Sequence, residues 1–415
     1  VMLEVLRIER IGLKDNFFSL GGDSIKAIQV VSRLGMNGYR LDINEIFKKP
    51  VVKELWKQVE RESGEIDQQA VTGSVPLTPI QAWYREQGFT QKQHWNMAVM
   101  VTRPGGYSPD LLQQVFKRIM EHHDLLRAVL SPDERTMEIK RPGEIEVLVE
   151  VINLEMMEKG SRELEDRVRE EADRIQAGID LKRGPLIKVA IFKTPGSDHL
   201  LMVIHHLVVD GISWRILLED ISRGYEQAGQ GREIRYPAKT HSFKDWSEAL
   251  AAYGRTPRLL NEYGYWREIC TAATPLLPIL GRTGAREGVR TKIKDYIQYT
   301  LEMGEEETRW LLTDVHRAYH TEINDILLST LGLAVKESFG VKKVMIHLEG
   351  HGREKISPHL DISRTVGWYT SIYPVVLEVE EKEPGPAADG EENLPLAWHI
   401  RRCKEAMRKI PRKGI

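Results

Sequence analysis

The chain contains 415 residues, of which 59 are Lys or Arg and 61 are Asp or Glu, so its formal net charge at pH 7 is −2. At roughly 150 residues per domain, this length predicts two or three folding units. The balanced charge argues against the basic surface of a nucleic-acid-binding or anionic-membrane-binding protein. A hydrophobic fraction of 41% is sufficient for packed cores and excludes a disordered chain.

Cysteine usage and hydropathy both favour a cytoplasmic protein. The two cysteines, Cys270 and Cys403, fit a reducing compartment better than a disulfide framework. No signal peptide is apparent, and no apolar run approaches the 18 residues of a spanning helix. The first residues have the pattern of a helix already under way, and the last, Pro411–Ile415, lack a natural end. We therefore expect this chain to be part of a longer protein.

Residues 1–62 are predicted to form a small helical domain. A short amphipathic helix, Val1–Arg10, precedes a loop, and apolar residues then recur at helical spacing after Ser24. Two further helices are expected at Ile43–Phe47 and Val51–Arg61. The polar, glycine-containing residues 63–75 are expected to be a linker.

The rest of the chain alternates between strand and helix patterns, which predicts a mixed α/β domain. We expect two lobes, 76–240 and 241–415, with Trp246–Trp266 crossing between them. The expected elements are helices at Leu111–Leu126, Ile212–Gly224 and Asp325–Ser338, strands at His199–His205, Val344–Leu348 and Tyr373–Val379, and an acidic loop at Glu380–Glu392.

Ser24 lies between a glycine turn, Gly21–Gly22, and the start of a helix. The free N–H groups and dipole of a helix N-terminus stabilise an anion such as a phosphate ester. The simpler interpretation is that Ser24 or Asp23 caps the helix, which is the commonest role of such residues. The residues alone leave both interpretations open.

The surrounding sequence DNFFSLGGDSIKA (Asp15–Ala27) closely resembles the carrier domain of nonribosomal peptide synthetases. The resemblance implies that Ser24 carries a covalent phosphopantetheine arm, added by a phosphopantetheinyl transferase, whose thiol holds an amino acid as a thioester. Carriers that serve ordinary condensation often have His before this serine. Asp23 in that place resembles the variant that serves an epimerization domain.

Two histidines, His205 and His206, end an apolar strand and lead into the sequence LVVDGISW (Leu207–Trp214). Neighbouring strand residues point to opposite faces, so only one of the two can face a given cavity. A hydrogen-bonded core histidine is the simpler interpretation. The spacing matches no zinc motif, so a metal hydrolase has little support. Asp210 is expected to orient an imidazole or, preferably, to pair with a buried Arg.

The string from His205 to Gly211 resembles the active-site signature of the chloramphenicol-acetyltransferase-like superfamily, which includes condensation and epimerization domains. The resemblance implies a two-lobed fold of that type after the four-helix carrier bundle. It also implies that His206 is catalytic, that His205 and Asp210 hold the loop, and that Gly211 keeps the backbone close to the substrate tunnel.

Glu349 opens the string EGHGRE (Glu349–Glu354) after a predicted strand. A glutamate in such a loop is most often simply solvated, and the two glycines allow a tight turn. This string resembles the epimerization-domain signature and is not typical of condensation domains. Supporting resemblances are PIQAWY (Pro79–Tyr84), NDILL (Asn324–Leu328) and RTVGWYTSIYP (Arg364–Pro374). The family continues past Ile415 with segments that line the active site, and without them we expect weak activity.

The resemblance therefore implies an isomerase that inverts Cα, L to D, of an aminoacyl or peptidyl thioester. Upstream adenylation and downstream condensation domains are the expected partners. A carboxylate in a dry site is a stronger base, so we expect burial of Glu349, with His206 on the opposite face of Cα. Two alternatives remain: a condensation domain that forms a peptide bond, and a non-catalytic module that only docks carriers.

Other polar and aromatic residues are assigned to structure. The His122–Asp124 triplet follows no catalytic spacing, and Arg127 is a candidate partner for a buried acid. No metal site is predicted. The tryptophans Trp83, Trp95, Trp214 and Trp368 are tempting as substrate contacts, but most such residues belong to a core or a lobe interface.

Overall fold

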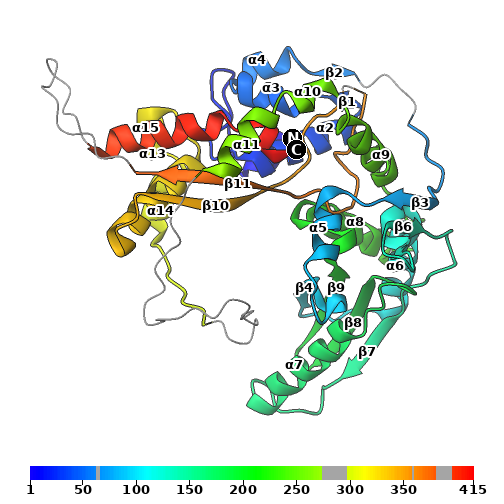
Figure 1. Cartoon of the computed structure of the whole chain (residues 1–415). Coiled ribbons are helices and arrows are strands. Elements are labelled where there is room, and N and C mark those ends of the chain that lie inside the picture. Colours follow the sequence, from blue (N-terminus) through cyan, green and yellow to red (C-terminus); the bar gives the residue numbers. More distant parts are fainter. Residues whose placement is uncertain (62–65, 273–296, 358, 380–394) are drawn as a thin grey trace, which may run out of the picture.

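The structure, a computed structural model, describes residues 1–61, 66–272, 297–357, 359–379 and 395–415. Among these residues no helix is long and apolar enough to cross a membrane. Figure 1 shows a lobe built around β4, β9, β8 and β7 and a separate lobe built around β10, β11, α14 and α15. The acidic loop expected at Glu380–Glu392 lies outside the described residues.

The N-terminal domain is a bundle of the helices α1 (Met2–Leu6), α2 (Ser24–Met36), α3 (Ile43–Lys48) and α4 (Val52–Trp56). Its core includes the buried side chains of Phe17, Val30, Ile46 and Leu55. The first and last helices are shorter than predicted. After α4 the chain forms β2 (Glu60–Arg61), which pairs with β1 (Tyr39–Arg40), because strand pairing replaces the last helical turns.

The first lobe is organised by a four-stranded sheet in the order β4–β9–β8–β7. Strand β9 pairs antiparallel with both β4 and β8, and β7 pairs parallel with β8. The apolar strand predicted at His199–His205 is confirmed as part of β9, which is buried along most of its length. The strands are β4 (Asn96–Arg103), β7 (Val149–Asn153), β8 (Ile187–Thr194) and β9 (Ser197–His205).

Helices α6 and α8 contact each other and contribute to the same core as the sheet. The predicted helices at Leu111–Leu126 and Ile212–Gly224 correspond to α6 and α8. Helix α6 ends four residues earlier than predicted and is followed by the 3-10 helix η2. The helices of this part are α5 (Pro79–Glu86), η1 (Lys92–His94), α6 (Pro109–His122), η2 (Asp124–Arg127), α7 (Arg162–Ala177), η3 (His206–Val208) and α8 (Gly211–Gly229).

A second, three-stranded sheet has the order β3–β6–β5, with β3 (Gly73–Pro76), β5 (Ala128–Leu130) and β6 (Thr136–Ile139). Its first strand begins at Gly73, within the predicted linker. The last linker residues therefore belong to this sheet. Predicted turns and helices at Trp246–Trp266 correspond to α9 (Phe243–Tyr253), α10 (Pro257–Leu260) and α11 (Tyr263–Thr271).

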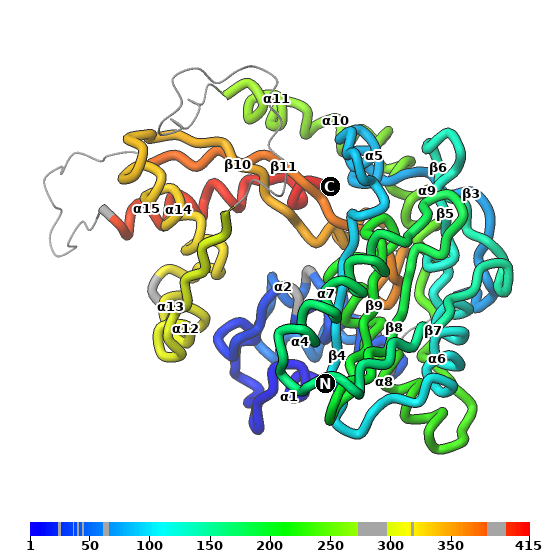
Figure 2. The backbone as a smooth tube through the Cα atoms, turned by 90° about the horizontal axis from the view of Figure 1, so that it is seen from below, coloured from blue at the N-terminus to red at the C-terminus, as the bar shows by residue number. Residues whose placement is uncertain are grey.

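The second lobe consists of an antiparallel pair, β10 (Lys343–Gly350) and β11 (Ser371–Glu378), packed against helices. Its helices are α12 (Glu305–Leu312), α13 (Val315–Tyr319), α14 (Ile323–Phe339), α15 (Pro395–Arg408) and η5 (Pro411–Gly414). Figure 2, turned from the first view, again separates this pair from the sheet of the first lobe. The predicted strand at Val344–Leu348 extends two residues further, so that it includes Glu349.

Candidate active site

His206 is placed at the end of the central strand β9, where the chain turns into η3. Its backbone N–H donates to the carbonyl of Trp95 at 2.9 Å, which continues the pairing of β9 with β4. Its imidazole is half-buried and lies against the indole of Trp368, with ring centroids 4.4 Å apart. Burial lowers the pKa of His206, while the negative charges of Asp210 and Glu349 act to raise it.

His205, the last residue of β9, is fully buried. Its Nδ1 accepts from the backbone N–H of Leu207 at 3.2 Å, so its Nε2 carries the proton and donates to the carbonyl of Lys92 at 2.9 Å. Burial lowers the pKa of His205 to about 4. The neutral ring thus ties the end of β9 to the segment before β4.

Asp210 begins helix α8 as its N-cap, and its carboxylate accepts from the backbone N–H of Ser213 at 2.7 Å. The same carboxylate pairs with Arg353, whose Nη2 lies 3.3 Å away, and both side chains are at least 95% buried. Gly211 is exposed, and a Cβ there would meet no atom within 4 Å. The described residues therefore give no steric reason for a glycine at this position.

Arg353 connects the two lobes, a role that the sequence interpretation did not assign to it. Its Nη1 donates to the carbonyls of Ile362 and Thr365, both at 2.9 Å, and its guanidinium lies 3.9 Å from the ring centroid of Tyr369. The sequence signals were its place in the Glu349–Glu354 string and the expectation that Asp210 pairs with a buried Arg.

Glu349 lies in β10, where it pairs with Ile372 of β11. Its carboxylate accepts from the hydroxyl of Thr370 at 3.4 Å. The side chain is exposed, so the burial that we expected for a strong base is not found. The expected position in a loop is also wrong, because the pairing with β11 continues through Gly350.

The segment Trp368–Thr370 links His206 of the first lobe to Glu349 of the second, because Trp368 lies against the imidazole and the Thr370 hydroxyl donates to the carboxylate. Trp368, whose indole lies against His206, is 2% exposed. Of the other tryptophans singled out in the sequence, Trp214 is buried in the same core, and Trp83 and Trp95 pack against it with their rings 6.3 Å apart.

Ser24 opens α2 on the carrier domain. Asp23 is the N-cap of this helix, because its Oδ1 accepts from the backbone N–H of Lys26 at 2.7 Å. The ammonium of Lys26 turns back to the carbonyl of Gly21 at 2.5 Å, which places a positive charge beside the helix start. A helix N-terminus with an adjacent cation fits a phosphate ester.

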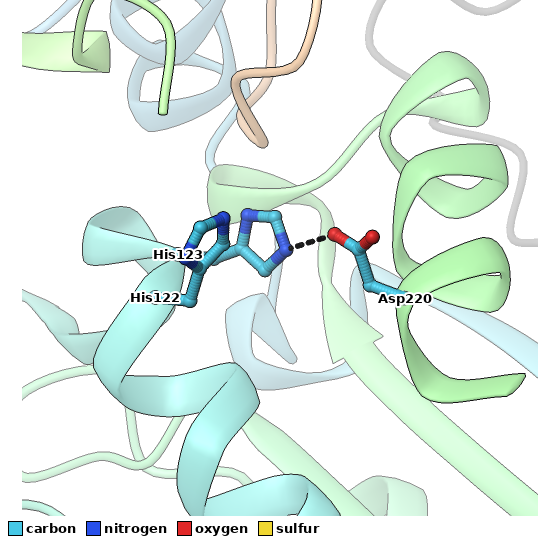
Figure 3. Close-up of side chains that lie close together, drawn as sticks. All are labelled: His122, His123 and Asp220. Atoms are coloured by element: carbon cyan, nitrogen blue, oxygen red, sulfur yellow. Dashed lines mark hydrogen bonds and ion pairs between the residues drawn. The ribbon is translucent and has the colours of Figure 1, made fainter. Parts of the chain in front are cut away.

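The histidines at the end of α6, His122 and His123, belong to a different cluster (Figure 3). The Nε2 of His123 lies 3.0 Å from a carboxylate oxygen of Asp220 on α8, and Arg364 donates to the other oxygen at 2.6 Å. Possible ligand atoms of His122, His123 and Asp220 lie within 4.8 Å of one another. Arg364 already neutralises the carboxylate of Asp220. A structural role therefore remains our prediction for the His122–Asp124 triplet.

Arg127 is fully buried and pairs with Asp124, three residues before it, at 2.8 Å. Its guanidinium also donates to the carbonyl of Val71 at 3.1 Å. This arginine therefore joins η2 to the segment that precedes β3.

Two family models match the chain: "Phosphopantetheine attachment site" over residues 1–59 and "Condensation domain" over residues 71–415. The chain belongs to the condensation-domain family of nonribosomal peptide synthetases. The predicted fold, a carrier followed by a two-lobed mixed α/β domain, is confirmed. The match over residues 1–59 identifies phosphopantetheine, attached covalently through a serine, as the cofactor.

Large synthetases are among the relatives of this condensation-family chain. Surfactin synthase subunit 2 of Bacillus subtilis (strain 168) is 43% identical over 417 residues, which cover 99% of this chain and 11% of that protein. Gramicidin S synthase 1 of Brevibacillus brevis is 42% identical over 423 residues, which cover 99% of this chain and 36% of that protein. The chain thus spans about a tenth to a third of the length of these relatives.

Solved structures give the same fold. The crystal structure of the epimerization domain from the third module of tyrocidine synthetase B is 43% identical, with a TM-score of 0.75 over 84% of this chain and 76% of that chain. The first condensation domain of the calcium-dependent antibiotic synthetase is 19% identical, with a TM-score of 0.61 over 82% of this chain and 75% of that one. The second likeness supports the fold alone.

Proposed function

We propose that this chain inverts Cα, from L to D, of an aminoacyl or peptidyl thioester held on its own carrier domain. The observation that carries the proposal is the meeting of the two lobes beside His206, where Trp368 lies against the imidazole and Thr370 donates to the carboxylate of Glu349. Inversion needs one group that removes the α-proton and another that returns a proton to the opposite face.

The substrate class follows from the carrier. We assign the phosphopantetheine attachment to Ser24, at the start of α2, where the helix N-terminus and Lys26 fit a phosphate ester. The arm supplies a thioester, which acidifies the neighbouring Cα–H. We expect adenylation and condensation domains as the neighbours that load the substrate and consume the product, and a phosphopantetheinyl transferase as the enzyme that adds the arm.

The two proposed catalytic groups must share one proton. If both were deprotonated, removal of the α-proton by one would leave the other with no proton to return. We therefore assign the reacting state to one protonated and one deprotonated group. Because burial lowers the pKa of His206, a proton on the imidazole depends on the opposing charges of Asp210 and Glu349.

The remaining residues of the site are positioning residues in this proposal. His205 holds the end of β9 through its bonds to Lys92 and Leu207. Asp210 fixes the start of α8 and holds Arg353, which lies four residues after Glu349. This ion pair links the His206 loop to the Glu349 segment across the lobes, and a fixed separation of two proton-transfer groups is what two-sided catalysis requires.

The test is deuterium incorporation at Cα from heavy water, measured by mass on the loaded chain, with the chirality of the released amino acid as a second readout. We expect His206→Ala and Glu349→Gln each to lower the incorporation rate by at least about 100-fold, the size typical of lost acid–base catalysis. Ser24→Ala is expected to abolish loading.

Two control variants keep the same chemistry away from the site. His199→Ala removes a histidine from the other end of β9, and Glu378→Gln removes a carboxylate from the far end of the β10–β11 pair. Both should exchange at the rate of the unmodified chain. Normal exchange by Glu349→Gln would remove this residue from the reaction. A dipeptide formed from two loaded carriers would instead support a condensation activity, and no exchange in the loaded, unmodified chain would support a non-catalytic docking module.

A further inference from the structure

The carrier domain contacts the catalytic domain in this structure through a specific pair of charges. The ammonium of Lys355 donates to the carboxylate of Asp42 at 2.5 Å, across 313 residues of sequence. The two side chains are 32% and 29% exposed, so neither is freely solvated. Nearby, the ammonium of Lys413 lies 5.0 Å from the ring centroid of Phe47 on α3.

A partly open pocket of about 100 Å³ lies beside this ion pair and is lined by residues of both domains. On the carrier side its walls include Ile28 and Val31 of α2, the helix that Ser24 opens one turn earlier. On the catalytic side they include Leu360, Ile362 and Trp246. Apolar side chains on both walls, with charges at the rim, are the usual composition of a protein–protein contact.

The catalytic side of this contact is continuous with the proposed active site. Arg353 lines the space between the domains and binds Asp210, at the end of the His206 loop. Lys355 follows two residues later, in the same segment that starts at Glu349. One short stretch of chain therefore carries the proposed catalytic carboxylate, the arginine that joins the lobes, and the lysine that holds the carrier.

We propose that the Asp42–Lys355 ion pair is the determinant that seats this carrier on its catalytic domain for delivery of the thioester. The inference rests on the proposed function, and it adds the partner surface and its selectivity. An ion pair at this level of exposure contributes orientation and discrimination more than affinity, because a carrier with a positive charge at position 42 would meet Lys355 with repulsion. The tether keeps the local concentration of the carrier high, so the effect on rate is moderate.

Charge reversal tests the proposal in the full, loaded chain. We expect Asp42→Lys and Lys355→Asp each to lower the rate of deuterium incorporation at the carrier-bound Cα by at least about fivefold. The double variant, which restores the pair with reversed signs, should recover the rate to within about twofold. A soluble pantetheine thioester of the same amino acid, which needs no carrier, should exchange equally in all these variants.

Two control variants change charge outside the contact. Glu54→Lys alters an exposed residue of the carrier helix α4, and Lys343→Asp alters the start of β10. Both should behave as the unmodified chain. Single reversals with unchanged rates, or a double variant no faster than the slower single variant, would overturn the proposal.

A readout without catalysis separates this inference from the proposed function. Amide hydrogen exchange of residues 360–363 reports whether the carrier covers them. We expect faster exchange there in each single reversal and restored protection in the double variant. If the unmodified chain exchanged no Cα proton on either substrate, the proposed function would fail, and the amide protection would still decide the role of the ion pair.

Discussion

Arg353 makes side-chain interactions with residues of both lobes. Its side chain is 3% exposed, and its guanidinium donates to Asp210, to Ser213 and to the carbonyls of Ile362 and Thr365. Five N–H donors in one plane allow this, and a lysine would satisfy only part of the set. The residue therefore holds Asp210 and the Glu349 segment in a fixed relation.

We expect Arg353→Met to lower the free energy of unfolding by about 3–5 kcal/mol, because it leaves the buried carboxylate of Asp210 without its cation. Arg353→Lys should also be destabilising, because an ammonium cannot reproduce the planar set of guanidinium hydrogen bonds to Asp210 and the two carbonyls. Urea denaturation followed by tryptophan fluorescence measures both.

Arg174 provides the matched control, because it also forms ion pairs but is 52% exposed. Arg174→Met should lower the free energy of unfolding by no more than about 1 kcal/mol. Equal losses for Arg353→Met and Arg174→Met would mean that burial of the pair does not matter.

At this scale the sequence predicted the kind of interaction but not its members. A buried Arg was expected for Asp210, yet Arg353 lies 143 residues away in the chain, and Arg127 was an equally visible candidate. Arg127 instead meets Asp124, three residues before it. Asp23 and Ser24 were both possible caps of α2, and the bond from Lys26 selects Asp23. Only folded geometry distinguishes such pairs.

At the scale of elements, the turn after β10 depends on Gly352. This residue has φ +66°, and a Cβ there would lie 1.6 Å from the carbonyl oxygen of Tyr369. Any other residue would have to push this turn away from the backbone of Tyr369 and Thr370, just before β11. The glycine is thus required both by its backbone conformation and by the closeness of the neighbouring chain.

We expect Gly352→Ala to destabilise the protein by more than about 3 kcal/mol, at the upper end of single substitutions. Gly340 has the same φ of +66°, but a Cβ there would meet nothing within 4 Å. Gly340→Ala should therefore lower the free energy of unfolding only by the energy of placing an alanine in the left-handed conformation, about 1–2 kcal/mol.

The difference between the two variants measures the steric contribution at Gly352 alone. Thermal or urea unfolding of both, under the same conditions, gives this difference. If the two substitutions cost the same, the close approach of Tyr369 would be relieved by a small shift of the turn.

Hydrophobic periodicity predicted most of the long elements. Helix α14 (Ile323–Phe339) and strand β9 (Ser197–His205) were both recognisable from their apolar residues. The ends were less predictable, because they depend on partners far along the chain. Glu349 was expected in a loop, but its backbone pairs with Ile372, and residues after Trp56 form a strand because Tyr39 and Arg40 offer one to pair with.

At the scale of the whole molecule, the two-domain organisation was predicted from short motifs rather than from packing. The DNFFSLGGDSIKA and EGHGRE strings identified the carrier and the catalytic family, and the fold was confirmed by its likeness to an epimerization domain. The ion pair between Asp210 and Arg353, which joins the lobes, and the contact between Asp42 and Lys355 join residues more than 140 positions apart. No local pattern encodes such distances.

Buried histidines in different parts of the molecule make its stability depend on pH. Burial lowers the pKa of His122 to about 3, and it lowers the pKa values of His205 and His351 to about 4. In the unfolded chain each of these groups takes up a proton near pH 6.5. The native state does not, so each histidine stabilises the fold above pH 6.5 and loses that contribution as the pH falls toward 4.

We expect the free energy of unfolding to decrease between pH 7 and pH 5, by at most about 1.4 kcal/mol per pH unit for each fully shifted histidine. Glu354 opposes this trend, because burial raises its pKa and its protonation favours the native state in acid. The urea midpoint measured across this range gives the slope. His122→Gln should reduce the slope, whereas His94→Gln, at an exposed position, should not. An unchanged slope in His122→Gln would show that its imidazole gains a proton as easily in the folded chain as in the unfolded one.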